Sequence, residues 1–142
     1  MESQGLAMQC AAIPYRRTEA GGLEILLVTS RGKANWIIPK GKVKPGKSAA
    51  ISAQEEVYEE SGARGLLDQA LVARCDLPAA GGETREHMQI FALEVQDLVL
   101  IWPEMFQRQR RWVSLAKAVE MVRAPHLRKA LKAFAAIMAP VV

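Results

Sequence analysis

The sequence lacks the segments that would carry a protein into or across a membrane. No apolar run approaches the roughly 18 residues that a membrane-spanning helix needs. The N-terminal segment Met1–Gly5 has neither the basic region nor the apolar region of a secretory signal. We therefore expect a cytoplasmic protein that does not bind membranes.

Cysteine is also scarce, and the chain contains only Cys10 and Cys75. The two are far apart in the sequence and lack the spacing of metal ligands, so we interpret them as buried free thiols. The sequence has neither an internal repeat nor a linker, and its 142 residues are a common length for one domain. A single domain over residues 1–142 is the prediction.

The net charge of +4, from 19 Lys and Arg against 15 Asp and Glu, is too small to indicate a nucleic-acid-binding protein. The distribution of charge is more informative. Residues 31–47 are basic without an acidic residue, and residues 55–60 are acidic without a basic one. A site for metal and polyphosphate would need such a basic loop beside an acidic helix. Two solvated surface patches of opposite charge are the alternative.

Hydrophobic patterning predicts an α/β protein, a mixed sandwich in which helices cover a sheet. Strands are expected at 7–15, 23–29, 36–38, 66–77, 88–95 and 111–113. Helices are expected at 48–61, at 115–122 and from Pro125 onward. The first two strands should form an antiparallel hairpin around Gly21 and Gly22. We interpret residues 40–47, rich in glycine, lysine and proline, as a loop.

Three glutamates share one face of the helix expected at 48–61. Glu56, Glu59 and Glu60 have spacings of three and four residues, so their side chains fall within about a third of a turn. Three like charges there repel one another, and a bound cation would reverse that cost. Mg²⁺ prefers oxygen ligands, and a few carboxylates together with substrate phosphates suffice to hold it. An exposed acidic surface without a metal is the alternative.

The segment from Gly41 to Ala63 resembles the Nudix box, G-x5-E-x7-R-E-U-x-E-E-x-G-U, in which U is a bulky aliphatic residue. The matching residues are Gly41, Glu56, Val57, Glu59, Glu60 and Gly62. Ala63 is aliphatic but small. The segments 36–41, 102–104 and 108–113 are similar to diadenosine-polyphosphate and diphosphoinositol-polyphosphate hydrolases of that family.

Two positions of the box differ from the family pattern, and both involve charge. Lys47 stands where the family has glutamate, and Glu55 stands where it has arginine. In the family these two residues are regarded as partners, so we interpret Lys47 and Glu55 as the same structural pair with its charges exchanged. Lys47 also places a cation near the expected metal, where it could weaken metal binding or contact a phosphate.

The resemblance implies a Nudix-like α/β/α sandwich with a mixed central sheet and a metal-dependent hydrolase that cleaves a phosphoanhydride bond. Glu56, Glu59 and Glu60 would be the catalytic residues and would hold Mg²⁺ or Mn²⁺, which neutralises the diphosphate and activates water. The candidate substrate-binding residues are Arg31, Trp36, Lys40, Gly41 and Lys42. The general base would be a helix glutamate or one of the loop residues Glu83, Glu86 and Glu104.

Several alternatives stay open. The substrate would be a small polyphosphate, either a dinucleoside polyphosphate or a diphosphoinositol polyphosphate. The 5′ end of RNA is a second possibility, although the sequence has no basic stripe interleaved with aromatic residues. A nucleotide-binding module with impaired catalysis is a third. Arg108, Arg110 and Arg111 would steer polyanions or form the exposed side of an edge strand, and Trp112 is expected in the core. The protein would be a monomer or a homodimer.

Overall fold

A computed structural model describes residues 9–32, 34–78 and 85–140. The candidate base Glu83 lies outside these residues. The strands are β1 (Gln9–Arg17), β2 (Leu23–Thr29), β3 (Trp36–Ile37), β4 (Lys40–Lys42), β5 (Ala63–Pro78), β6 (Arg85–Leu98) and β7 (Arg110–Ser114). The helices are α1 (Ala49–Ser61), α2 (Leu115–Met121) and α3 (Pro125–Met138). Within the described residues, every helix is too short or too polar to span a bilayer.

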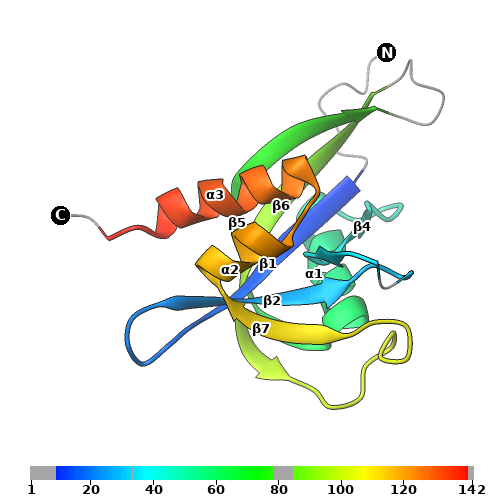
Figure 1. Cartoon of the computed structure of the whole chain (residues 1–142). Coiled ribbons are helices and arrows are strands. Elements are labelled where there is room, and N and C mark those ends of the chain that lie inside the picture. The colour runs from blue at the N-terminus through cyan, green and yellow to red at the C-terminus, as the bar shows by residue number, and fades with distance from the viewer. Residues whose placement is uncertain (1–8, 33, 79–84, 141–142) are drawn as a thin grey trace.

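The strands form one mixed sheet in the order β3-β2-β1-β6-β5, with β4 paired to β1 and β7 paired to β2 (Figure 1). Strand β1 runs antiparallel to β2 and parallel to β6. The predicted hairpin is therefore confirmed, and so is the mixed central sheet. Strands β5 and β6 extend beyond the predicted ranges, and their pairing shifts register after Arg64 and again after Asp68.

Helices cover both faces of the sheet, as the sandwich prediction requires (Figure 1). Alternate residues of β1 point to opposite faces, because side chains alternate along a strand. Ile13 packs in the core beneath α2 and α3, together with Leu131 and Phe134 of α3. Cys10 packs in the other core, against Ala53 of α1. Each fully buried large apolar side chain contributes about 1.5–3 kcal/mol.

Local signals fix both ends of α1, the helix that carries the three glutamates. The Ser48 hydroxyl accepts a hydrogen bond from the backbone N–H of Ile51, as expected of an N-cap residue. Gly62 ends the helix in the left-handed conformation at φ 76°, which favours glycine. A Cβ at Gly62 would also meet Arg110 at 2.9 Å and Trp102 at 3.0 Å. These two ends set which residues of α1 face the site.

One prediction about the backbone is wrong. Residues Lys40–Lys42, expected to begin a loop, form strand β4, which pairs antiparallel with Gln9 to Ala11 of β1. A Lys-Gly-Lys segment has little intrinsic strand propensity, so tertiary pairing rather than local sequence creates this strand. The pairing brings the backbone of Lys40 and Gly41 against α1.

Candidate active site

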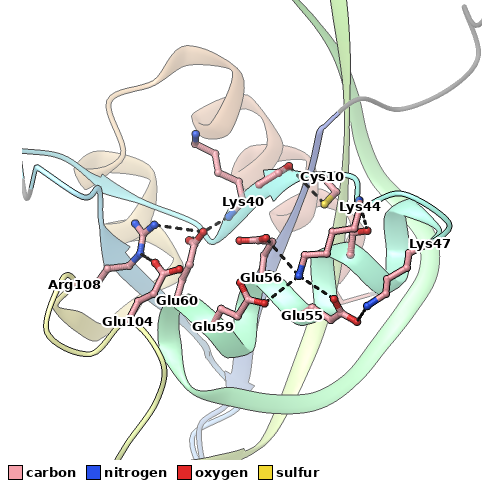
Figure 2. A network of polar contacts seen from close by, with 12 residues as sticks. Cys10, Lys40, Lys44, Lys47, Glu55, Glu56, Glu59, Glu60, Glu104 and Arg108 are labelled. Atoms are coloured by element: carbon pink, nitrogen blue, oxygen red, sulfur yellow. Dashed lines mark hydrogen bonds and ion pairs between the residues drawn. The ribbon is translucent and has the colours of Figure 1, made fainter.

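The three glutamates of α1 line up beside strand β4, but they do not point to one common partner (Figure 2). Exposure of the side chain is 13% for Glu56, 38% for Glu59 and 4% for Glu60. Glu56 and Glu59 point to the ammonium group of Lys44, whereas Glu60 points to the guanidinium of Arg108. The face therefore runs from a solvated carboxylate to a buried one.

Gly41 allows β4 to lie directly against the carboxylate of Glu56. A Cβ at this position would stand 2.5 Å from Glu56 Cδ and 2.8 Å from each carboxylate oxygen. Real Cβ atoms do not approach other atoms so closely, so any side chain at Gly41 would turn the carboxylate away. Gly41 thus acts by giving room to Glu56, and its carbonyl oxygen accepts a hydrogen bond from the Cys10 thiol at 3.6 Å.

Arg108 joins two carboxylates inside the protein. Its Nε donates to Glu104 Oε1 at 2.7 Å, its Nη1 donates to the carbonyl oxygen of Thr29 at 2.9 Å, and its Nη2 lies 3.5 Å from Glu60 Oε2. The residue is 8% exposed. The prediction that Arg108 steers polyanions or lies on an exposed strand face is therefore wrong, because its charge is already used by buried acidic partners.

The carboxyl groups of Glu56 and Glu60 hold their protons more strongly than usual. Burial raises the pKa of Glu60 from 4.5 to about 8, although the charge of Arg108 opposes the shift. Burial also raises the pKa of Glu56, and the charge of Glu59 adds to that effect. The two groups share a hydrogen bond, so they titrate together. Burial thus favours the protonated form at this end of the face.

The raised pKa of Glu60 predicts a pH-dependent stability of the metal-free protein. The folded chain binds this proton more tightly than the unfolded chain, so the stabilisation is fully present below pH 4.5 and is lost as the pH rises through about 8. The free energy of unfolding should therefore fall across that window. Denaturant titrations with a chelator should show a weaker fall in Glu60→Gln, whose side chain is permanently neutral. Equal slopes in the two proteins would contradict this origin.

Lys44 lies at the centre of the acidic cluster, a role that the sequence did not predict. Its Nζ is 2.8 Å from Glu55 Oε1, 3.0 Å from Glu59 Oε2 and 3.8 Å from Glu56 Oε2 (Figure 2). These carboxylates raise the pKa of Lys44, so it stays charged. The only sequence signal was the position of Lys44 in the basic segment, three residues after Gly41, and five other basic residues share that segment.

The predicted partners Lys47 and Glu55 do lie together, with Lys47 Nζ 2.7 Å from Glu55 Oε2. Glu55 is shared, because its other oxygen binds Lys44. The hydrogen bond from Lys44, and then that from Lys47, lowers the pKa of Glu55. Glu55 thus binds basic side chains from the loop, and its role as a structural partner stays a prediction.

A double-mutant cycle with Lys47→Met and Glu55→Gln tests that role. We expect a small coupling in the free energy of unfolding, and we expect added salt to reduce it, because both side chains are exposed and solvent screens their charges. Denaturant titrations at low and high ionic strength measure it. Strictly additive losses in the free energy of unfolding at both ionic strengths would show that the contact does not stabilise the fold.

The residues predicted to bind substrate occupy different surroundings. Arg31 is exposed, with Nη2 3.6 Å from Glu104 Oε2, and Lys42 is exposed at the end of β4. Lys40 donates its backbone N–H to Glu60 Oε1 at 3.3 Å, while its side chain points away from the carboxylates (Figure 2). Trp36 packs against the core beneath α2 and α3. Of the predicted residues, Arg31 and Lys42 are therefore the exposed charged ones, and Arg31 already contacts Glu104.

Glu104 is the loop carboxylate that reaches this site. Its backbone N–H donates to the carbonyl oxygen of Glu59 at 3.0 Å, and its side chain binds Arg108. The other described candidate base, Glu86, accepts a hydrogen bond from Gln9 of β1 at 2.5 Å. A base acting beside α1 is therefore better matched by Glu104 than by Glu86.

Arg110 and Trp102, from the C-terminal half of the chain, hold the end of α1 in place. Arg110 stacks on Trp102 at 3.9 Å and donates hydrogen bonds to the carbonyl oxygens of Ser61 and Val99. Trp102 Nε1 donates to the carbonyl oxygen of Glu60 at 3.0 Å. These contacts satisfy carbonyl groups at the end of α1 and so fix its last turn.

The donor chemistry of the glutamate face fits a hard divalent cation. Carboxylate oxygens are the ligands that Mg²⁺ and Mn²⁺ prefer, and the ammonium group of Lys44 shows that positive charge is accommodated among Glu55, Glu56 and Glu59. The described residues contain no group of three acidic, histidine or cysteine side chains already arranged around a metal position. A divalent ion could therefore bind here only if these side chains rearranged. The ammonium group of Lys44 would have to move first.

A cavity of about 620 Å³ opens beside the acidic cluster. It runs along α1 from Ile51 to Glu59, is open to solvent, and is bordered by the start of β5 and by Gln96 of β6. Tyr58 and Arg64 supply an aromatic ring and a cation to its wall. The five residues predicted to bind substrate do not line it, so the cavity is a feature that the sequence did not reveal.

Residues 8–134 match the NUDIX domain family. Nudix hydrolase 21, chloroplastic, of Arabidopsis thaliana is 32% identical over 133 residues, covering 92% of this chain and 67% of that protein. Diphosphoinositol polyphosphate phosphohydrolase 2 of Rattus norvegicus is 27% identical over 126 residues, covering 86% of this chain and 66% of that protein. The chain thus spans about two thirds of the length of these relatives.

Solved structures share the fold. An Ap4A hydrolase of C. elegans superposes with a TM-score of 0.71 at 21% identity, covering 94% of this chain and 99% of that one. A NUDIX hydrolase from Nitrosomonas europaea gives a TM-score of 0.73 at 21% identity, covering 94% and 90%. The chain belongs to the Nudix family. It is a hydrolase of the Nudix type, as its sequence predicted.

Proposed function

We propose that this chain is a divalent-metal-dependent hydrolase of a phosphoanhydride bond in a small polyphosphate, such as a nucleoside polyphosphate. The observation that carries the proposal is the position of Glu56, Glu59 and Glu60 on one face of α1, with Gly41 clearing space for Glu56 and a cation already held among these carboxylates. This arrangement combines hard oxygen ligands with positive charge at one point.

Glu56, Glu59 and Glu60 would hold Mg²⁺ or Mn²⁺. The ion would neutralise the diphosphate and make water more acidic. The protein's own contribution is to position the substrate and to stabilise its charge, because phosphoryl transfer needs little covalent help. Arg31, whose Nη2 lies 3.6 Å from Glu104 Oε2, and the exposed Lys42 would bind the outer phosphates. The proton of the attacking water would pass to Glu104 or to a glutamate of α1.

A compact polyphosphate is the preferred substrate class, namely a dinucleoside polyphosphate or a diphosphoinositol polyphosphate. Relatives with diphosphoinositol polyphosphate phosphohydrolase in their names support this choice, as does an Ap4A hydrolase with the same fold. The exposed Arg31 and Lys42 would neutralise outer phosphates. The wall of the cavity offers the ring of Tyr58 and the guanidinium of Arg64, which Asp97 already binds, for a further group of the substrate.

The experiment is a phosphate-release assay with Mg²⁺ over a panel of dinucleoside polyphosphates, diphosphoinositol polyphosphates, nucleoside triphosphates and 5′-triphosphorylated RNA. Turnover of the first two classes and little turnover of the others is the expected result. Preferred turnover of the RNA would favour a 5′-pyrophosphohydrolase. Nucleotide binding without turnover of any compound would favour the impaired module.

We also propose that residues 1–142 form one catalytic domain, that it works in the cytoplasm, and that it is a monomer or a homodimer. Relatives whose names carry chloroplastic or mitochondrial labels make the compartment a separate question from the activity. Light scattering together with fractionation of tagged full-length protein would test the assembly and the location.

A further inference from the structure

Lys44 is held in the acidic cluster by its backbone as well as by its charge. Its backbone N–H donates to the Ser52 hydroxyl at 3.0 Å, and Ser52 is fully buried in the first half of α1. This hydrogen bond fixes the segment just after β4 against the helix. The side chain of Lys44 therefore starts from a defined point, and its ammonium group reaches the cluster (Figure 2).

The ammonium group of Lys44 performs two tasks that need to be separated. It binds Glu55, which lies outside the set of proposed metal ligands, at 2.8 Å. It also binds Glu59 at 3.0 Å and approaches Glu56 to 3.8 Å, and both of these are proposed ligands. Lys47 differs, since its ammonium group contacts Glu55. One lysine thus competes for the proposed ligands, and the other supplies a nearby comparison of equal charge.

We propose that Lys44 is a tethered counter-cation that holds the glutamate face together in the metal-free protein and that an incoming divalent ion must displace. The inference rests on the proposed metal site. An ammonium group and a divalent cation cannot share the oxygens of Glu59, because like charges at such short range repel strongly in a partly buried site. Lys44 therefore lowers metal affinity, and it removes the repulsion that the three glutamates would otherwise exert on one another.

Glu55 gives the displaced side chain a place to remain. Lys44 Nζ already touches Glu55 Oε1, so it can release Glu59 and Glu56 while keeping one charged partner. Glu55 occupies the position where the Nudix box has arginine, and an arginine there would repel Lys44 instead of binding it. The exchanged charges of this box thus form a device with two positions for one ammonium group, one on the metal ligands and one beside them.

The test is equilibrium binding of Mn²⁺, followed through the electron paramagnetic resonance signal of the free ion, at constant ionic strength. Lys44→Met should bind Mn²⁺ about tenfold or more tightly than the wild type, a size typical for neighbours of metal ligands. Lys47→Met is the matched control and should bind like the wild type. Glu55→Gln should bind more weakly, because Lys44 then has only the metal ligands to pair with.

Thermal unfolding provides a second readout that does not depend on activity. Metal-free Lys44→Met should melt at a lower temperature than the wild type, and Mn²⁺ should raise its melting temperature by more, because tighter binding to the folded state stabilises it further. Lys44→Gln, which keeps a hydrogen-bond donor without the charge, should behave in the same way and replaces Lys44→Met if that protein does not fold.

The outcomes separate this inference from the proposed function. If the wild type binds Mn²⁺ and both Lys44 variants bind it equally or more weakly, the proposed role of Lys44 as a counter-cation is overturned. The proposed metal site would then stand. If Lys47→Met tightens binding as much as Lys44→Met, a general change in charge is responsible and the inference fails. If neither the wild type nor the Lys44 variants bind Mn²⁺, the proposed metal-dependent function fails, and displacement fails with it.

Discussion

Replacing Glu59 by glutamine is expected to lower kcat by about 100-fold or more, the cost typical of losing one preorganised charged contact in an active site. Glu59 is the most exposed of the three glutamates and makes few contacts that hold the fold, so the variant should remain folded. Glutamine keeps the shape and removes the charge that a divalent ion needs. Steady-state kinetics at saturating Mg²⁺ on the substrate found with the phosphate-release panel would measure the loss.

Glu55→Gln is the matched control for this experiment. Glu55 lies on the same helix, has a similar exposure of 34% against 38%, and also binds the ammonium group of Lys44. At saturating metal it should retain kcat within a few-fold, because Glu55 is not among the proposed ligands. Equal losses in Glu55→Gln and Glu59→Gln would show that the pairing with Lys44, rather than metal binding, makes these carboxylates important.

The register of α1 could be predicted because its signals are local. Ser48 caps the start of the helix and Gly62 ends it. The glutamates between them therefore lie within one helix, and their spacing predicts that they share a face. Local chemistry of this kind does not depend on the rest of the fold. The same holds for the hairpin of β1 and β2, whose apolar runs are separated by a glycine turn.

The positions of Lys44 and Arg108 could not be predicted in this way. Lys44 enters the cluster because β4 pairs with β1 and Ser52 binds the backbone that follows β4. Arg108 enters it because the loop before β7 passes over α1, where Glu104 binds the backbone of Glu59. Both placements depend on contacts between distant segments. A long basic side chain in a loop has no sequence pattern that shows whether it meets solvent or a buried carboxylate.

Together these contacts reduce the repulsion among the three glutamates of α1. At one end Glu60 is buried beside Arg108, and its pKa is raised to about 8. At the other end Glu59 remains partly exposed and is paired with Lys44. Glu56 lies between the two ends, next to Gly41. Protonation at the buried end and an ammonium group at the solvated end each reduce repulsion, and a divalent cation would replace both.

Gly41→Ala should lower kcat about as much as removing a ligand, roughly 100-fold, while changing the free energy of unfolding by only about 1 kcal/mol. The added Cβ would stand 2.5 Å from Glu56 Cδ, and the carboxylate, at the end of a flexible side chain, can rotate away at small cost to the fold. Gly32→Ala is the control, since a Cβ there meets no atom within 4 Å among the described residues, its chain neighbours apart. It should leave both kcat and stability close to the wild type.

The double variant Gly41→Ala with Glu56→Gln separates this explanation from a general disturbance of β4. If Gly41 acts only by giving room to the Glu56 carboxylate, the loss in the double variant should not exceed the larger of the two single losses, because both changes disable the same group. Multiplied losses would mean that the alanine also harms the site by another route, such as the backbone N–H of Lys40 that binds Glu60. Kinetics of all three variants at saturating Mg²⁺, with denaturant titrations to verify folding, distinguish the two cases.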